Sequence, residues 1–422
     1  MRKKVIVKGP ALSQTGYGEQ TRFALRSLRS REDLFDIYII NLEWGNSNHI
    51  VADTEFRAWI IQSIQKTAQY IQQTEGTPQF DMSLQVTIPN EFEKMAPINV
   101  GYTAGIETTK VAPVWLQKTN EIMDHLIVIS NHSKNVFDAT IAEAQDEKGN
   151  KFPYKLQKPC YAITYPIKPQ ESTAVDLDLP YEFNYFATSQ WGPRKNFANT
   201  VRWFVEECFD REVGLVLKTN WLKNCTMDRY HTVKRLEALL EPYSDRKCSV
   251  TLLHGYMSEK EMQGLYRHEK IKAFINIAHG EGFGLPIFDA AAAALPVLTI
   301  GWGGQTDFLY IPTKNKSGKV KPKSSFMKVD YDLLPVQQEA VWDGVIQADS
   351  QWAFPKEGSY KMALRRMFNE YHVYKGMANK LSKWVCDTFT EEKQYKQFVD
   401  LFLDGQDIST ENEEWWDVVT HD

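Results

Sequence analysis

The most constraining feature of the sequence is the alternation of short apolar, β-branched runs with longer stretches of helical period. This alternation is typical of parallel strands joined by crossover helices. The runs fall into two groups along the chain, and each group predicts a doubly wound sheet of its own. The predicted strands are residues 5–7, 36–42, 83–88, 98–103, 125–130 and 161–165 in the first half, and 183–188, 213–217, 250–253, 273–277 and 296–300 in the second.

The chain divides between these two groups of strands. Residues 166–180 contain three prolines and have no helical period, which is typical of a linker. A chain of 422 residues also exceeds what one ordinary core accommodates. We therefore predict an α/β protein with a Rossmann-like domain at 1–168, a linker at 169–181, a second Rossmann-like domain at 182–385, and C-terminal helices at 386–422 that pack back on the first domain. Trp415 and Trp416 in this last segment need a surface on which to pack.

Composition narrows the class of protein. Hydrophobic residues make up 43% of the chain and charged residues 24%, as in soluble globular proteins. A formal net charge of -5 argues against a generally basic, nucleic-acid-coating protein. No apolar run approaches the ~20 residues that span a bilayer, and the first residues lack the apolar stretch of a secretory signal, so we expect a cytoplasmic protein. The five cysteines include no Cys-x-x-Cys pair, so we predict no zinc site.

Residues 9–18 form a glycine-bearing loop between the first predicted strand and a helix. Gly16 and Gly18 would let backbone amides approach a phosphate at the amino terminus of that helix. A flexible turn explains the same glycines equally well. A nicotinamide-binding interpretation, with Glu43 as the ribose-binding acid, is disfavoured because the third glycine is missing and Gly16 lies too far beyond the strand.

The most informative segment is residues 278–297, which has the pattern of a strand end, a glycine loop and a helix. Pro286 fits the first turn of that helix, where a missing N–H costs nothing. Glu281 would then lie in the loop and Asp289 on the helix, where both carboxylates could hold sugar and ribose hydroxyls. The backbone amides of Gly282, Phe283, Gly284 and Leu285 could meet an anion. A glycine turn that packs an alanine-rich helix on the sheet explains the alanines but not the carboxylate pair.

Arg194 and Lys195 occupy the matching position after an earlier strand of the second half. Two adjacent cations at the start of a helix oppose the helix dipole, so they are unfavourable there unless an anion lies between them. This position favours a phosphate clamp over an ordinary surface charge pair.

These segments together resemble the retaining glycosyltransferases of family 4, which have the GT-B fold of two Rossmann-like domains facing a central cleft. The resemblance covers nearly the whole chain, and several motifs in the right order are far more specific than any one of them. The matching segments are residues 15–18, 101–108, 113–115, 123–124, 129–134, 194–196, 281–286 and 331–336.

The resemblance implies a function for each matching residue. Arg194 and Lys195 would bind the diphosphate of a nucleotide-diphosphate sugar, with Lys218 assisting, and Glu281 would hold the donor sugar. Asp289 would hold the ribose, although the family usually has glutamate there. The base pocket would be lined by His254, Gly255 and Tyr256, and Glu107 would lie on the acceptor side. Members of the family are thought to retain configuration by front-face attack, and GT-B enzymes generally need no metal, so we expect no cofactor beyond the donor.

Six lysines follow the proposed donor segment in a loop that also carries glycine, proline and serine; they are Lys314, Lys316, Lys319, Lys321, Lys323 and Lys328. A solubilising hairpin is the usual role of such a run. The run could also attract a polyanionic acceptor, for example a modified base in nucleic acid, although the missing aromatic residues weaken single-strand binding. The acceptor could otherwise be a glycan, a lipid or a small molecule. A further alternative, motivated by Asp289, is a binding module that keeps the nucleotide-sugar cleft but has lost transfer.

Overall fold

A computed structural model of the chain describes residues 2–45, 47–52, 54–314 and 318–404. The described residues form two compact units. Unit 1 contains residues up to 166 together with 336–350 and 389–404, and unit 2 contains residues 167–335 and 351–388. Residues 167–183 contain no helix or strand. This segment nevertheless lies against the rest of unit 2, where the Thr173 amide donates to the Lys260 carbonyl over 2.9 Å.

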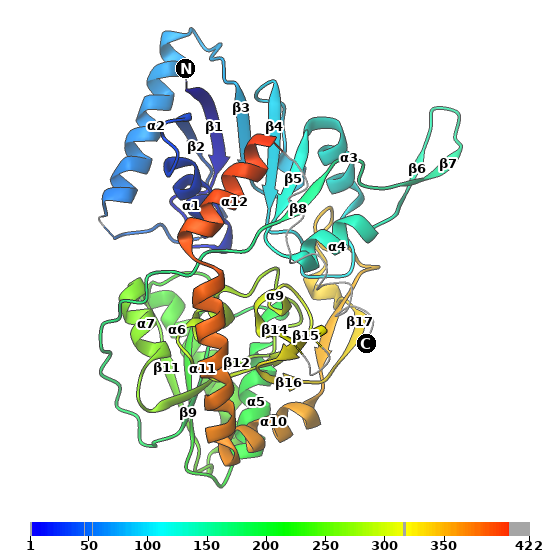
Figure 1. Ribbon diagram of the computed structural model, residues 1–422. Coiled ribbons are helices and arrows are strands. Elements are labelled where there is room, and N and C mark those ends of the chain that lie inside the picture. The colour runs from blue at the N-terminus through cyan, green and yellow to red at the C-terminus, as the bar shows by residue number, and fades with distance from the viewer. Residues whose placement is uncertain (1, 46, 53, 315–317, 405–422) are drawn as a thin grey trace. The chain divides into compact units, whose positions relative to one another are not determined.

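Unit 1 is built on a six-stranded parallel sheet with the order β2-β1-β3-β4-β5-β8 (Figure 1). Its strands are β1 (Lys3–Gly9), β2 (Phe35–Asn41), β3 (Met82–Val86), β4 (Ile98–Thr103), β5 (His125–Val128) and β8 (Cys160–Ala162). Its helices are α1 (Gly16–Arg29), α2 (Glu55–Gln73), α3 (Pro113–Ile122), α4 (Asn131–Ala139) and α12 (Glu391–Asp404). A hairpin of β6 (Ala142–Gln145) and β7 (Lys151–Tyr154) extends away from this sheet (Figure 1).

Unit 2 repeats the architecture with the strand order β11-β10-β9-β12-β13-β16, again entirely parallel. Its strands are β9 (Asn184–Gln190), β10 (Gly214–Asn220), β11 (Ser249–Leu253), β12 (Ile271–Asn276), β13 (Val297–Ile300) and β16 (Met327–Val329). Its helices are α5 (Phe197–Cys208), α6 (Thr226–Leu240), α7 (Glu259–Tyr266), α8 (Leu285–Ala292), α9 (Thr306–Leu309), α10 (Glu357–Asn369) and α11 (Tyr371–Thr388). Two hairpins complete the unit, formed by β14 (Tyr310–Lys314) with β15 (Val320–Ser324) and by β17 (Tyr331–Pro335) with β18 (Gln351–Pro355).

All eleven strands predicted from the sequence are present in the two parallel sheets. Their cores are the buried, β-branched runs from which they were predicted, such as Val5, Ile6 and Val7, none of which is exposed. The sequence pattern did not predict β16, an edge strand of the second sheet, or the strands of the three hairpins, although a hairpin was one interpretation of the lysine run. These strands are short or rich in lysine and proline, which gives them little of the β-branched signal.

The last described helix, α12, belongs to unit 1 although it follows α11 of unit 2. It packs on α1, and its Phe398 ring lies 5.4 Å from Phe23 and 5.2 Å from Tyr102, between ring centroids. Phe402 contacts Phe35 at 5.8 Å in the same way. Both side chains of α12 are fully buried. Trp415 and Trp416, which the sequence places in this region, lie outside the described residues.

In the described part of the chain, no helix combines the length and the apolar character that crossing a bilayer requires.

The packing of α12 predicts a large loss of stability on replacing Phe398 by Ala. Removing a fully buried phenyl ring leaves a cavity beside the rings of Phe23 and Tyr102, and such changes cost about 3–5 kcal/mol. We expect this decrease in the free energy of unfolding in a denaturant titration followed by circular dichroism. The same substitution at Phe152, which is 42% exposed on β7, should cost less than about 1 kcal/mol. Equal losses in the two variants would show that α12 contributes no more to stability than an exposed hairpin.

Candidate functional site

The segment between β12 and α8 forms a tightly packed loop in unit 2. Gly284 begins α8 with a φ of +90°, a left-handed conformation that suits glycine. A second loop, residues 301–304, lies against it, and the Gly304 amide donates to the Glu281 carbonyl over 2.8 Å. A Cβ atom on Gly304 would lie 1.9 Å from the Gly282 carbonyl oxygen, so only glycine permits this approach. Glu281 is thereby held at the carboxyl end of β12.

The Glu281 carboxylate accepts hydrogen bonds from three side chains. Lys195 Nζ lies 2.6 Å from Oε1 and 2.8 Å from Oε2, and Arg194 Nη1 lies 3.2 Å from Oε2. Asn276 Nδ2 donates to Oε1 over 3.0 Å. Glu281 is only 6% exposed. Burial by itself would raise its pKa, but the charges of Lys195 and Arg194 outweigh burial and lower the pKa to about 2. The carboxylate is therefore ionised and paired with cations.

Arg194 and Lys195 come from a neighbouring strand of the same sheet. They lie in a single 3-10 turn after β9, Pro193–Lys195, which ends at Asn196 in the left-handed region with a φ of +52°. Arg194 Nη1 also donates to the Gly280 carbonyl over 2.7 Å, and the His279 amide donates to the Arg194 carbonyl over 2.8 Å. The loops after β9 and β12 are therefore joined by both backbone and side chains.

Two residues that the sequence reasoning missed support this arrangement. Asn276, the last residue of β12, positions Glu281 and also accepts from the Ala278 amide over 2.9 Å. The buried His279 ring donates from Nδ1 to the Ala353 carbonyl over 2.7 Å and stacks on Trp352 with centroids 5.1 Å apart. Burial lowers the pKa of His279. Strand β18 thus supports the loop that carries Glu281.

The other predicted donor-site residues of unit 2 lie on different elements of that unit. Lys218, at the end of β10, donates to the Gly255 carbonyl, and burial lowers its pKa. Tyr256 is 47% exposed. Asp289 is half-buried on α8, where its charge adds to the larger effect of burial in raising the pKa of Tyr266. Phe283 faces inward and packs on two other rings, those of Phe288 and Phe308.

His254 points its side chain toward Asp228. Its Nε2 atom donates to the Asp228 carboxylate over 2.8 Å, and its side chain is 2% exposed. The same carboxylate accepts from the backbone amides of Trp221, Leu222 and Lys223. Burial opposes ionisation of Asp228, but the bond from His254 and the three amides lower its pKa. His254 and Asp228 together therefore hold the loop after β10 in place. The pocket-lining role of His254, Gly255 and Tyr256 stays a prediction.

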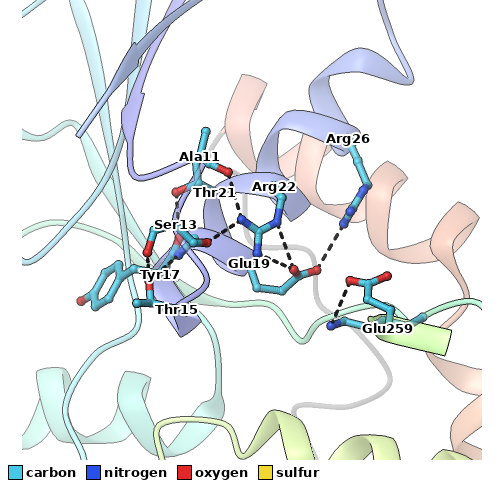
Figure 2. A network of polar contacts seen from close by, with 11 residues as sticks. Ala11, Ser13, Thr15, Tyr17, Glu19, Thr21, Arg22, Arg26 and Glu259 are labelled. Atoms are coloured by element: carbon cyan, nitrogen blue, oxygen red, sulfur yellow. Dashed lines mark hydrogen bonds and ion pairs between the residues drawn. The ribbon is translucent and has the colours of Figure 1, made fainter. Parts of the chain in front are cut away.

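The glycine loop of unit 1 is held in place by an arginine that the sequence reasoning also missed. Figure 2 shows the buried Arg22 guanidinium donating to the Ala11 and Ser13 carbonyls over 2.9 and 2.7 Å and pairing with Glu19 over 2.9 Å. Thr15 caps α1 by accepting from the Gly18 amide over 3.1 Å. The loop is therefore held by side-chain contacts as well as by the backbone.

The two glycines of this loop differ in how tightly they are packed. A Cβ atom on Gly18 would lie 2.0 Å from the Ser13 carbonyl oxygen, whereas one on Gly16 would meet nothing within 4 Å. Glu107 is half-buried, and its charge adds to burial in raising the pKa of the nearby Tyr17, whose hydroxyl bonds Thr103 over 2.8 Å.

Five of the six predicted polyanion-binding lysines are described, and they lie elsewhere in unit 2. Lys314, Lys319, Lys321 and Lys323 belong to the β14–β15 hairpin, and Lys328 lies on β16. Lys316 lies outside the described residues. Among the residues that the structure describes, no group of three or more His, Cys, Asp or Glu side chains could hold a metal ion.

Solved structures identify the fold. A sucrose-phosphate synthase from Thermosynechococcus elongatus superposes with a TM-score of 0.61 at 13% identity, over 95% of this chain and 98% of that one. A glycosyltransferase from Rickettsia africae superposes with a TM-score of 0.58 at 12% sequence identity, with the same coverage of both chains. The catalytic domain of starch synthase IV from Arabidopsis thaliana, bound to ADP and acarbose, gives 0.54 at 11% identity over 95% and 98%. The chain therefore has the GT-B fold, as predicted. Its sequence matches no protein-family model and no curated protein.

The low pKa of Glu281 predicts a specific dependence of stability on pH. Its pKa is about 2 in the folded protein and 4.5 when unperturbed, so the ionised form stabilises the fold above about pH 4.5 and this contribution is lost as the pH falls toward 2. The stability advantage of the wild type over Glu281→Gln should shrink by about 2 kcal/mol between about pH 5 and pH 3. Unfolding titrations at several pH values measure this difference.

A matched control separates this effect from general weakening of unit 2. Ile275→Val removes one methyl group from the buried residue next to Asn276 and should cost about 1 kcal/mol at every pH. A wild-type advantage over Glu281→Gln that stays constant across the range would show that the carboxylate gains nothing from Arg194 and Lys195.

Proposed function

We propose that the protein is a retaining, metal-independent glycosyltransferase that moves a sugar from a nucleotide-diphosphate sugar to an acceptor hydroxyl. The observation that carries this proposal is the cluster of Arg194, Lys195 and Glu281 at the carboxyl ends of two adjacent parallel strands. Open α/β sheets bind their ligands at that edge. The GT-B fold supports the proposal, because proteins named as a glycosyltransferase and as synthases have it, one of them bound to ADP.

The proposed reaction matches the charges of the cluster. The bond between the anomeric carbon and the diphosphate oxygen breaks, its electron pair stays on the phosphate, and the sugar ring becomes positive. The acceptor oxygen attacks from the face that the phosphate leaves, and its proton passes to the departing phosphate oxygen. Arg194 and Lys195 would stabilise the negative charge that develops on that phosphate. No protein nucleophile is required by this scheme.

The contacts of Glu281 imply an exchange of partners on donor binding. Both cations donate to this one carboxylate. A diphosphate carries more negative charge and would draw Arg194 and Lys195 to itself. Glu281 would then accept hydrogen bonds from the sugar hydroxyls, while Asn276 keeps Oε1 in place.

Loss of the cluster should abolish most turnover. We expect Glu281→Gln, and the double variant Arg194→Met with Lys195→Met, each to lower release of nucleoside diphosphate by roughly 100-fold, the effect of removing about 3 kcal/mol of transition-state stabilisation. The donor for this assay is first identified by thermal shift against UDP-, ADP- and GDP-sugars, since a selective ligand raises apparent stability. Release is then followed with the candidate acceptors and without them.

The matched control for Lys195→Met is Lys260→Met, which removes an exposed lysine of the same unit and should leave turnover unchanged. Wild-type turnover in both cluster variants would refute the assignment. Donor binding without release under any acceptor condition would instead assign the protein as a nucleotide-sugar-binding module.

The partner exchange makes a second prediction, about affinity. In Glu281→Gln the internal anion that competes for both cations is gone, so UDP or ADP should bind roughly tenfold more tightly even though transfer is lost. Arg194→Met with Lys195→Met should weaken binding of the same ligand. Isothermal titration calorimetry measures both changes. Weaker binding by Glu281→Gln would contradict the exchange, because it would mean that the carboxylate assists the diphosphate.

A further inference from the structure

The β14–β15 hairpin forms a separate two-stranded antiparallel ribbon in unit 2, which we call the basic ribbon (residues 310–314 and 318–324). In the sequence, residues 308–329 contain six lysines and not a single Asp or Glu. Lys314, Lys321 and Lys323 are exposed, and none of them forms an ion pair with a carboxylate of the described chain. Lys314, Lys321 and Lys323 therefore present positive charge that no described carboxylate pairs, on a protein whose formal net charge is -5.

The hairpin β6–β7 shows how a solubilising ribbon in the same chain is composed. It carries Lys148 and Lys151, but it also carries Glu143, Asp146 and Glu147. Lys151 Nζ lies 2.7 Å from Glu143 Oε1 across the strands. Mixed charges of this kind keep a surface soluble. The basic ribbon departs from this composition, so solubility does not explain its lysines.

Protection of a sheet edge does not explain them either. Charged side chains and prolines both discourage pairing of an exposed strand with another chain. In the basic ribbon Pro312 lies directly opposite Pro322, so each strand already lacks a backbone donor at its centre. The lysines are additional to this protection.

The lysines of the basic ribbon point to both of its faces. Lys321 and Lys323 lie opposite Thr313 and Ile311, and alternate residues of a strand share a face, so these two lysines project on one side. Lys314 lies opposite Val320 and projects on the other side. A planar membrane could contact the charge of only one face, whereas the walls of a nucleic-acid groove carry phosphates on two sides.

The basic ribbon is connected closely to the Glu281 cluster. Only α9 separates it from the loop whose Gly304 amide bonds the Glu281 carbonyl. At its base, a Cβ atom on Gly301 would lie 3.2 Å from the Tyr310 hydroxyl and 2.8 Å from Lys328 Cε. A polyanion on the ribbon would therefore be held in the same unit as the proposed donor site.

We propose that the basic ribbon is a docking surface for double-stranded nucleic acid, which it binds through the phosphate backbone. The major groove of a duplex admits a two-stranded β-ribbon, and lysines on both faces reach the phosphates on its two sides. Within the described residues 310–314 and 318–329 there is no exposed large hydrophobic side chain to insert into a membrane or to stack on single-stranded bases. This inference goes beyond the proposed function, because docking requires no turnover.

The test measures binding of the full chain to an unmodified, fluorescently labelled DNA duplex of about 20 base pairs by anisotropy, without any nucleotide sugar. If about four phosphates are contacted, affinity should fall roughly 100-fold between about 50 and 200 mM salt. The variant Lys314→Gln, Lys321→Gln and Lys323→Gln should bind at least about tenfold more weakly and reduce the slope of log affinity against log salt by about 2 to 3.

The matched control replaces Lys148, Lys151 and Lys155 by Gln in and next to the β6–β7 hairpin, which changes the net charge of the chain by the same amount. We expect this control to bind the duplex within about twofold of the wild type. Thermal melting and nucleotide binding by both variants show that unit 2 remains folded.

Other outcomes would overturn the proposal. Equal losses in the two triple variants would assign any binding to overall charge. Tighter binding to phosphatidylserine-containing vesicles or to a single-stranded oligonucleotide would assign the ribbon to that partner instead, and absence of salt-sensitive duplex binding would leave the ribbon without this role. Because no sugar transfer is measured, failure here is distinct from failure of the proposed glycosyltransferase activity.

Discussion

The buried salt bridge between Glu281 and the pair Arg194 and Lys195 is the constraint on which the candidate site depends. A carboxylate that is 6% exposed is strongly unfavourable unless cations and hydrogen-bond donors surround it. Here two cations and an amide do so, and they come from two neighbouring strands of the sheet. The same contacts fix the positions of both loops relative to each other. Two cations paired with one carboxylate also leave a local excess of positive charge, which favours an anionic ligand at this edge of the sheet.

The cluster is supported by strand β18, which follows a segment of the chain that belongs to unit 1. Strand β18 holds His279 through Ala353 and Trp352, but residues 336–350, which connect β17 to β18, belong to unit 1. There Val345 lies in a buried apolar cluster with Trp115. The chain thus leaves unit 2 and returns to it immediately before the strand that supports the Glu281 loop.

The sequence predicted two features of the protein: the strands, from hydrophobic periodicity, and the edge of the sheet where the site lies, from the parallel order of the strands. The eleven predicted strands are short apolar runs whose burial in the sheets favours the extended conformation. The proximity of Arg194, Lys195 and Glu281 followed from the same logic, because segments after parallel strands meet at one edge of a sheet. The basic ribbon was visible as a run of lysines, but its strands were not, since lysine and proline carry little β signal.

The polar residues that support the site could not be predicted in the same way. Asn276, His279 and Arg22 act through contacts with residues distant in the sequence, such as Ala353, and no local pattern distinguishes them from other polar residues. His254 illustrates the same point. Its position at the end of a strand predicted a pocket-lining residue, whereas no sequence pattern indicated the bond from its imidazole to Asp228 on α6. Position in the sequence locates a backbone, whereas the direction of a side chain is decided by its partners.

The charge distribution of the chain also shows why net charge is a poor guide to binding. The cations near Glu281 are half-buried and balanced in part by a carboxylate, so salt screens them less than exposed charges. The lysines of the basic ribbon are exposed, and at physiological salt they are screened over about 8 Å from the acidic remainder of the chain. A ligand at either place responds to the charges within that distance and not to the total of -5. The acidic composition that excludes a general nucleic-acid-coating protein is therefore compatible with one local, salt-sensitive contact to a polyanion.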